Sequence, residues 1–490
     1  MRFRQLFLRA PAGTQLFVSM QRDGTARTSP ADGLPLPIWP DGRWCAEVAL
    51  YLGKAVRRNL SLFSRGGTVA TYTSQISHLV RYCWRKNCPF DAMDDDEFTK
   101  FMGGMKDELL FKNDEPKDSR NSNTVISIGR RCLEFLEFVG NLHGITGLLS
   151  GEEGHIKAER RAMAVGSSHA ARKRIVHYWY HHSFPERVED NKRHLIGIDY
   201  VTRLRRAAIT YKSAKMGRSD PFIKQRRLVL LRLLEATGGR RCEIALITVE
   251  DIQEALASVG PFLKLYSAKR TGNNKSNEPH RFVKVTYNDL DYIQRYIDKF
   301  RAPLIDRLLG SESDHGFLLV GVDHAERMVE TTITGELRRL RIEAKITGKA
   351  HPHLFRHRFI TIRLKDLIEA HKLSNRTEFE ILFQMEGFKK EVAESTGHKS
   401  LASLDRYIDW AFIELAGSEG NERKFVDMAR VAASVESSLA EIEALRESLS
   451  PEQFTLELMH RYEALAQDVG ARVGPKKRTA GNQTLHDATQ

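Results

Sequence analysis

The chain has 490 residues, of which 41% are hydrophobic and 28% are charged, a balance that is typical of globular proteins. Lysine and arginine number 76 against 63 acidic residues, so the formal net charge is +13. A basic surplus of this size favours a polyanionic partner, either a nucleic acid or an anionic membrane surface. Membrane insertion is disfavoured because no apolar run approaches the ~18 residues that a spanning helix needs, so we expect no membrane partner.

The cysteines are few, odd in number and scattered, at positions 45, 83, 88, 132 and 242. None of them forms the paired CxxC motifs of a structural metal site, which argues against a bound metal. Free thiols are typical of the reducing cytosol. We therefore expect a cytoplasmic protein, associated with the nucleoid if its source is a prokaryote.

The first 150 residues divide into two segments. Residues 1–60 are rich in glycine, proline and arginine and predict an irregular N-terminal arm or extension. Residues 61–150 have apolar side chains at helical spacing, which predicts a small helical domain with a basic exterior, for which a solvated face is the default interpretation. Its three helices are expected at 67–87, 94–110 and 123–140.

Residues 151–194 have no steady hydrophobic period and mix basic residues with aromatic ones, so we interpret them as a basic linker. His177 and His181 have the i, i+4 spacing of some metal sites. No carboxylate or thiolate is suitably placed beside them in the sequence. A polar, basic connector is therefore favoured over a metal site.

The pattern from 195 to 412 is mixed and predicts a separate domain. A helix at 222–236 is expected to end at Gly238, and residues 262–286 alternate around a polar turn as a β-hairpin does. The fold class is therefore mainly α with a small β-sheet, an α+β domain beside the helical one. Further helices are expected at 287–300, 331–345, 353–371, 376–385 and 388–395.

The C-terminal part is predicted to be a helical extension over residues 413–474, followed by a disordered tail over 475–490. Ser450 and Gln453 have the spacing of a capping box at the start of its second helix. Two interpretations stay open, because the extension could fold back on its own domain or dock on a neighbouring protomer.

Two helical stretches of the 195–412 domain carry side chains that suit phosphate chemistry. Arg240 follows the glycines that end a helix, where an arginine can bind phosphate through two parallel hydrogen bonds, and Glu243 is placed to orient it. His353, Arg356 and His357 share one face of a helix. Such a face suits an anion with a transferable proton better than it suits a metal ion.

Two further stretches supply a lysine, a histidine and a tyrosine. Lys269 ends the first strand of the predicted hairpin, and Lys275 in its loop is the alternative. His398 follows Gly397, and Tyr407 lies nine residues beyond it. Taken alone, Tyr407 is expected to pack against its own helix. A phenol becomes a good nucleophile only when cations from elsewhere in the chain lie beside it.

In order and spacing, these stretches resemble the tyrosine recombinase, or phage integrase, family. The family motifs are TGxRxxE, a hairpin lysine, HxxRH, GH and a tyrosine nine residues later. They correspond here to Thr237–Glu243, Lys269, His353–His357, Gly397–His398 and Tyr407. The resemblance covers about residues 195–412, and the helical block at 61–150 is similar to the core-binding domain of the family in pattern only. Thr396 departs from the leucine usual before GH.

The resemblance implies a site-specific recombinase that cuts and rejoins double-stranded DNA through a covalent 3′-phosphotyrosyl intermediate, with no metal, ATP or other cofactor. It implies a homotetramer on two DNA sites and allows for accessory DNA-bending proteins or a partner recombinase. The implied roles are nucleophile for Tyr407, phosphate clamp for Arg240 and Arg356, proton transfer for His353, phosphate contact for His398, general acid for Lys269 and support for Glu243 and His357.

Three alternatives stay open. A type IB topoisomerase uses nearly the same chemistry, but relaxes supercoils as a monomer without a defined site. A catalytically silent DNA-binding accessory protein would keep the fold, although every expected catalytic position is filled here. A metal-dependent nuclease would be inhibited by a chelator.

Overall fold

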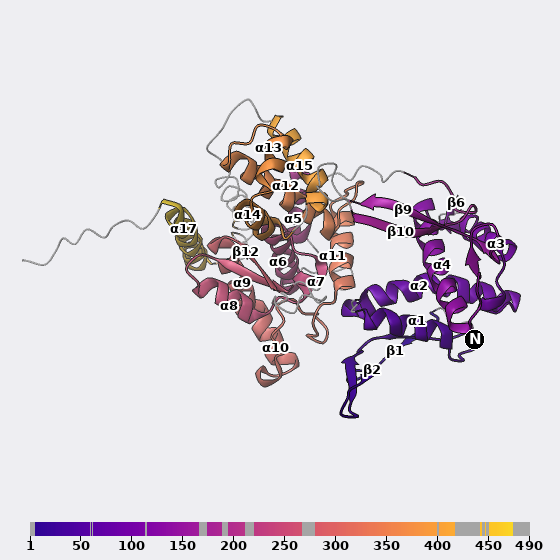
Figure 1. The fold of residues 1–490 in the computed structure, drawn as a ribbon. Coiled ribbons are helices and arrows are strands. Elements are labelled where there is room, and N and C mark those ends of the chain that lie inside the picture. Colours follow the sequence, from indigo (N-terminus) through magenta and orange to yellow (C-terminus); the bar gives the residue numbers. More distant parts are fainter. Residues whose placement is uncertain are drawn as a thin grey trace, which may run out of the picture. The chain divides into compact units, whose positions relative to one another are not determined.

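The structure is a computed structural model. It describes residues 5–58, 60, 62–112, 115–165, 174–188, 195–210, 220–266, 280–398, 401–416, 442, 446 and 450–473. These residues are mostly helical, and every sheet among them has two strands, as the predicted fold class requires (Figure 1). The chain divides into two compact units. Unit 1 contains Met1–Arg193, and unit 2 contains His194–Ser267 and Pro279–Gln490.

Unit 1 is built around four helices that share one core: α1 (Ala46–Arg57), α2 (Phe63–Lys86), α3 (Asp95–Lys106) and α4 (Ser122–His143). The apolar stripe predicted for α2 is buried, with Val69, Ile76 and Leu79 inaccessible to solvent. α4 packs against the other three helices, because its buried residues cover more than one face. The three helices expected in this part of the sequence are confirmed.

The N-terminal 60 residues have more regular structure than the expected irregular arm. β1 (Phe7–Arg9) pairs with β4 (Pro35–Pro37), and β2 (Gln15–Met20) pairs with β3 (Ala26–Pro30), both antiparallel. Glycines with positive φ, such as Gly24, make the tight turns between these short strands. Leu6 is buried in the same core as α1 to α4, so the segment is part of unit 1.

The expectation of an irregular linker at 151–194 was wrong for much of that segment. β9 (Glu159–Val165) and β10 (Arg174–Tyr180) form an antiparallel hairpin, and β10 packs on α4. The guanidinium of Arg130 on α4 lies 4.0 Å from the ring centroid of Tyr178 on β10. The other strands of unit 1 are β5 (Leu109–Lys112), β6 (Glu115–Asp118), β7 (Leu149–Ser150) and β8 (Ile156–Lys157).

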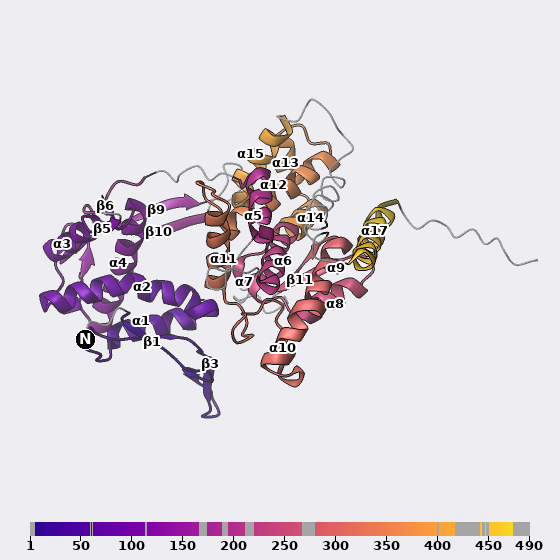
Figure 2. The same ribbon diagram turned by 180° about the vertical axis from the view of Figure 1, so that it is seen from behind.

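The described residues of unit 2 form a helical domain with one β-hairpin, and Figure 2 shows it from behind. Its strands are β11 (Phe262–Tyr266) and β12 (His280–Lys284). Its helices are α5 (Ile198–Thr210), α6 (Pro221–Thr237), α7 (Arg241–Ala245), α8 (Val249–Ala257), α9 (Tyr287–Tyr296), α10 (Ala302–Leu308), α11 (Glu330–Glu343), α12 (Pro352–Ala370), α13 (Arg376–Leu382), α14 (Glu386–Thr396), α15 (Leu401–Ala416) and α17 (Pro451–Val473).

α6 is the central helix of unit 2 and packs against α5, α9 and α12. Its arginines are buried together with its leucines, and each needs a carboxylate to offset the loss of water. Arg227 Nε donates to Glu336 Oε2 at 2.7 Å, and Arg232 Nη1 donates to Asp289 Oδ1 at 3.2 Å. Within the part of the chain that the structure describes, no helix is both long enough and apolar enough to cross a membrane.

The predicted hairpin and the predicted capping box are both present. β11 and β12 pair antiparallel, with Phe262 opposite Lys284, while the connecting loop lies outside the described residues. Ser450 Oγ accepts the N–H of Gln453 at 3.3 Å, and Gln453 Oε1 accepts the N–H of Ser450 at 3.4 Å. The helix that they begin, α17, packs against α9 of its own unit. Residues 474–490 lie outside the described part.

Candidate active site

The glycines before α7 set the position of Arg240. Gly238 ends α6 with φ +55°, and a Cβ there would lie 2.5 Å from the ring of Phe359, so no other residue fits without rearrangement. At the next turn, the backbone N–H of Arg240 donates to Glu243 Oε2 at 3.0 Å, and its Nη1 donates to Oε1 at 2.7 Å. Glu243 therefore holds both the start of α7 and the guanidinium of Arg240.

Arg356 enters the same region from α12 and is only 1% exposed. Its Nη1 donates to the carbonyl of Gly238 at 2.9 Å, and its Nη2 donates to that of Thr396 at 3.3 Å. Burial lowers the pKa of Arg356 to about 9, and the nearby charges of Arg240 and Arg281 act in the same direction. A guanidinium in such surroundings is stabilised when an anion binds beside it.

A third arginine, Arg281 on β12, belongs to this cluster and was missed by the sequence analysis. It is 6% exposed, and its Nη2 donates to Glu243 Oε2 at 2.8 Å. Its Nε and Nη1 are buried and make no hydrogen bond to the described residues. The signal available in the sequence was the alternation of β12, which buries Arg281 and Val283 on the face opposite to the exposed Phe282.

Glu243 is the one carboxylate that Arg240 and Arg281 share, and it is fully buried. Burial alone would raise the pKa of Glu243, but the charges of Arg281 and Arg240 hold it at about 2. With Arg356, the cluster contains three guanidiniums and one carboxylate, a surplus of two positive charges. Such a surplus, with donors directed inward, suits a phosphate group.

The GH segment closes the cluster at the end of α14. A Cβ on Gly397 would lie 3.6 Å from Arg356 Nη2 and 3.7 Å from Arg281 Nε, so the two guanidiniums flank the same small space. Burial lowers the pKa of His398 to about 3, and the charge of Arg356 contributes next. His398 is therefore neutral near pH 7, and its Nδ1 is buried with no hydrogen-bond partner among the described residues.

Tyr407 reaches this region from α15, which packs on α12. The side chain is 6% exposed, and its hydroxyl shares a hydrogen bond of 2.7 Å with His357 Nδ1. Its ring centroid lies 5.8 Å from that of His398 and 5.7 Å from that of Trp410, and Arg356 is close enough to interact with it electrostatically. The structure thus brings Tyr407, His357, His398 and the arginine cluster together.

The remaining predicted residues lie at the edge of the site or outside the described part. His353 is exposed on the first turn of α12, and its ring centroid lies 4.2 Å from that of His357. His357, predicted only as support, is the histidine bonded to the phenol, so it is a second candidate for proton transfer. Lys269 and Lys275 both fall outside the described residues, so the choice between them stays a prediction.

Comparison with known proteins identifies the larger part of this domain. Residues 218–380 match the phage integrase family. The match is confined to this part of unit 2. The match contains all three arginines of the cluster and ends before His398 and Tyr407. Among curated proteins, none matches the chain.

Several solved structures are similar to the chain at low identity. A XerA recombinase is 16% identical, with 77% of this chain and 99% of that chain covered and a TM-score of 0.31. The XerH site-specific recombinase bound to a palindromic difH substrate is 13% identical, with 77% and 85% covered and a TM-score of 0.42. The integrase from mycobacterium phage Brujita is 12% identical, with 79% and 97% covered and a TM-score of 0.25.

Proposed function

We propose that the chain is a site-specific DNA recombinase that cuts and rejoins double-stranded DNA through a covalent 3′-phosphotyrosyl intermediate. The observation that carries the proposal is the position of Tyr407 beside Arg356, in a cluster whose other two guanidiniums, those of Arg240 and Arg281, share the buried carboxylate of Glu243. The phage integrase match of residues 218–380 supports the same class of reaction. The net charge of +13 suits a DNA partner.

In the proposed cleavage step, the Tyr407 oxygen forms a bond to the scissile phosphorus while the bond from phosphorus to the 5′-oxygen breaks. Negative charge grows on the non-bridging oxygens in the transition state, and Arg240 and Arg356 are placed to hold them. Preorganised guanidiniums stabilise this charge more than they stabilise the ground state. Attack by a 5′-hydroxyl of another strand reverses the step and rejoins the DNA.

Proton transfer in this scheme needs an acceptor at the phenol and a donor at the leaving oxygen. His357 is bonded to the Tyr407 hydroxyl, and the neighbouring His353 is exposed, so the pair offers a path from the phenol to solvent. Neutral His398 donates a hydrogen bond to the phosphate. Lys269 of the predicted hairpin, or Lys275 as the alternative, protonates the departing 5′-oxygen.

The arginines take the role that metal ions have in many nucleases, so we propose a reaction without metal or ATP. The phosphotyrosyl bond conserves the energy of the broken phosphodiester, which makes rejoining possible without a cofactor. Strand exchange between two duplexes needs one tyrosine nucleophile for each DNA strand that is cut. The proposed active assembly is therefore a homotetramer on two DNA sites.

The proposal is tested with nicked genomic fragments from the source organism as candidate target DNA. The nick lets the freed end diffuse away, so a covalent protein–DNA adduct accumulates. We expect adducts at a few defined sequences, formed equally well in EDTA. Relaxation of supercoiled DNA without sequence preference would indicate a topoisomerase, and inhibition by EDTA that a divalent ion reverses would indicate a nuclease.

A further inference from the structure

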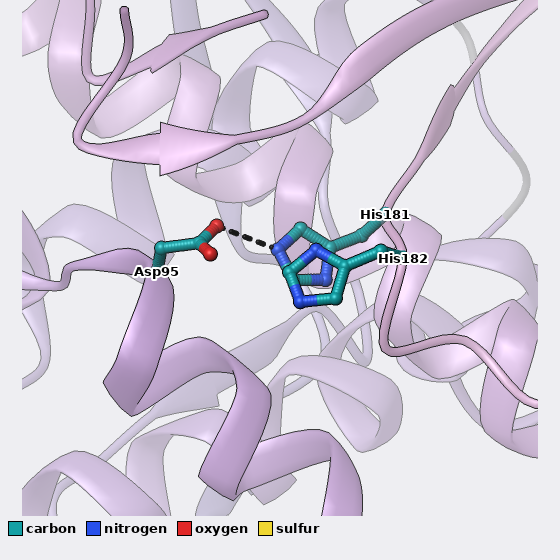
Figure 3. A group of neighbouring side chains, drawn as sticks. All are labelled: Asp95, His181 and His182. Carbon is teal, nitrogen blue, oxygen red and sulfur yellow. Dashed lines mark hydrogen bonds and ion pairs between the residues drawn. The ribbon is translucent and has the colours of Figure 1, made fainter. Parts of the chain in front are cut away.

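Unit 1 contains a group of metal-binding residue types that the proposed recombination chemistry does not use. Asp95 is the first residue of α3, and His181 and His182 directly follow β10, far along the chain. Figure 3 shows the carboxylate of Asp95 directed at the ring of His181, with the ring of His182 beside it. One ligand atom from each residue lies within 4.8 Å of the other two.

His181 is fixed in position by three polar contacts, one of which is the backbone N–H of Ser183 donating to Nδ1 at 3.2 Å. The side chain is fully buried, with Nε2 2.9 Å from Asp95 Oδ1 and Nδ1 2.7 Å from Ser183 Oγ. The ring of Phe98 meets it edge-on, with the centroids 4.9 Å apart. Histidines that bind metals commonly have their second nitrogen held by a polar group, which sets the direction of the first. Ser183 is placed for that role, with Nε2 directed at Asp95.

The other two residues leave ligand atoms open to an incoming ion. Asp95 Oδ1 accepts from His181 and from the backbone N–H of Lys157 at 2.8 Å, whereas Oδ2 makes no hydrogen bond to the described residues. His182 is exposed, and its ring centroid lies 4.2 Å from that of His181. The Nε2 atom of His182 lies 3.4 Å from Thr99 Oγ1. This is a long, weak hydrogen bond, so replacing it with a bond to a metal would cost little free energy.

The residue types also fit a metal. Two imidazoles and one carboxylate are ligands that Zn²⁺ accepts readily.

We propose that Asp95, His181 and His182 form a zinc-type metal site in unit 1, with water as the fourth ligand. The bound ion would join the start of α3 to the end of the β9–β10 hairpin and so stabilise the fold of unit 1. Without an ion, the hydrogen bond between Asp95 and His181 would make the same link, and His182 would have no part in it. The role of His182 therefore separates the two explanations.

The test uses the full, untagged chain, stripped with a chelator and titrated with Zn²⁺ by calorimetry and with Co²⁺ by visible absorption. We expect one ion per chain and a higher unfolding temperature with Zn²⁺, because a ligand that binds only the folded state stabilises it. His182→Ala and Asp95→Asn should each weaken binding at least tenfold and remove the thermal shift. The amide introduced by Asp95→Asn retains an oxygen for the bonds from His181 and Lys157, so this variant should still fold.

His177→Ala is the matched control, because His177 is an exposed histidine on β10 close to the proposed site in sequence. It should bind both ions as the natural chain does. The proposal is overturned if the natural chain shows no saturable binding of either ion. It is equally overturned if His182→Ala and Asp95→Asn bind with unchanged affinity. Neither outcome depends on recombination activity, so it leaves the proposed function untouched.

Discussion

Arg281 is a buried cation with spare hydrogen-bond donors. Its Nη2 is paired with Glu243, while Nε and Nη1 have no partner among the described residues. A buried donor left without a partner costs about 1–3 kcal/mol, more when it is charged. The space beside Gly397, which Arg356 also borders, is where those donors would meet a phosphate oxygen. We therefore interpret Arg281 as a third phosphate contact beside Arg240 and Arg356.

Replacing Arg281 by glutamine should slow adduct formation about 10²–10³-fold, the range seen when one oxyanion donor is removed. DNA binding should change much less, because the donor is needed most as charge develops on the phosphate. Single-turnover cleavage of a nicked substrate measures the rate, and filter binding measures affinity. Lys284→Gln, an exposed change on the same strand, is the control. If Arg281→Gln cleaves DNA at the natural rate, Arg281 does not contact the reacting phosphate and only supports Glu243.

His398 should make the stability of unit 2 depend on pH. Its pKa is about 3 when folded, mainly through burial, against an ordinary value of about 6.5. Between these values the unfolded chain binds more protons, so stability rises with pH and is lost as pH falls through this window. Glu243, with its pKa at about 2, contributes the same sign at lower pH, where unfolded glutamates take up protons.

The measurement is urea unfolding at pH 5 and pH 7. The His398 contribution amounts to about 2 kcal/mol more stability at pH 7. In His398→Gln this part of the difference should disappear, because glutamine does not titrate. An unchanged difference between the two pH values would show that His398 is not held neutral in the folded protein.

The sequence predicted most members of the site, because their spacing along the chain is local and regular. It could not predict which side chain bonds Tyr407, because that depends on how α12 approaches α15 in space. Arg281 was missed for a related reason. An arginine on a short strand is expected to face solvent, and only the approach of Glu243 shows why it faces inward.

At the scale of elements, the two long hairpins show what periodicity can and cannot predict. β11 and β12 alternate buried residues with more exposed ones, and the sequence predicted them. β9 and β10 were taken for a linker because basic side chains cover their aromatic rings, as Arg161 covers Tyr180 at 3.4 Å. That packing leaves no simple period of two in the sequence.

The contact between α17 and α9 is testable through one acidic residue. Glu457 pairs with Arg295 and with Arg461, and its Oε2 lies 3.7 Å from Lys299 Nζ. Burial would raise the pKa of Glu457, but these cations keep it below its ordinary value. Glu457→Gln should therefore loosen α17 by about 1 kcal/mol without unfolding the rest of unit 2.

Hydrogen exchange of the α17 amides measures this loosening directly. Exchange should be faster in Glu457→Gln and unchanged in Glu463→Gln, an exposed position on the same helix that makes a matched control. Equal protection of α17 in both variants would argue that the helix does not depend on α9. Docking on a neighbouring protomer, the other interpretation of the extension, would then be favoured.

At the scale of the whole molecule, α17 also presents an apolar face that α9 does not cover. Leu456, Met459 and Tyr462 lie three residues apart and are 60%, 59% and 73% exposed. Exposed apolar side chains in a row indicate a surface that contacts another molecule. In the proposed tetramer, a neighbouring protomer is the natural candidate.

We predict that Met459→Glu weakens assembly on DNA but leaves the binding of one protein to one site intact, because a charge at this face opposes its burial. Analytical ultracentrifugation with a synthetic target duplex measures the size of the complexes, and thermal unfolding checks the fold. Complexes of unchanged size at equal protein concentration would show that this face of α17 takes no part in assembly.

Attack of the Tyr407 hydroxyl on DNA is tested by identifying the amino acid that becomes covalently joined to the DNA. After incubation with nicked genomic fragments, adducts are digested with protease and nuclease and the nucleotide-linked peptide is sequenced by mass spectrometry. We predict that the nucleotide is on Tyr407 and that Tyr407→Phe forms no adduct while still binding DNA. A nucleotide on any other residue, or an adduct formed by Tyr407→Phe, would contradict this prediction.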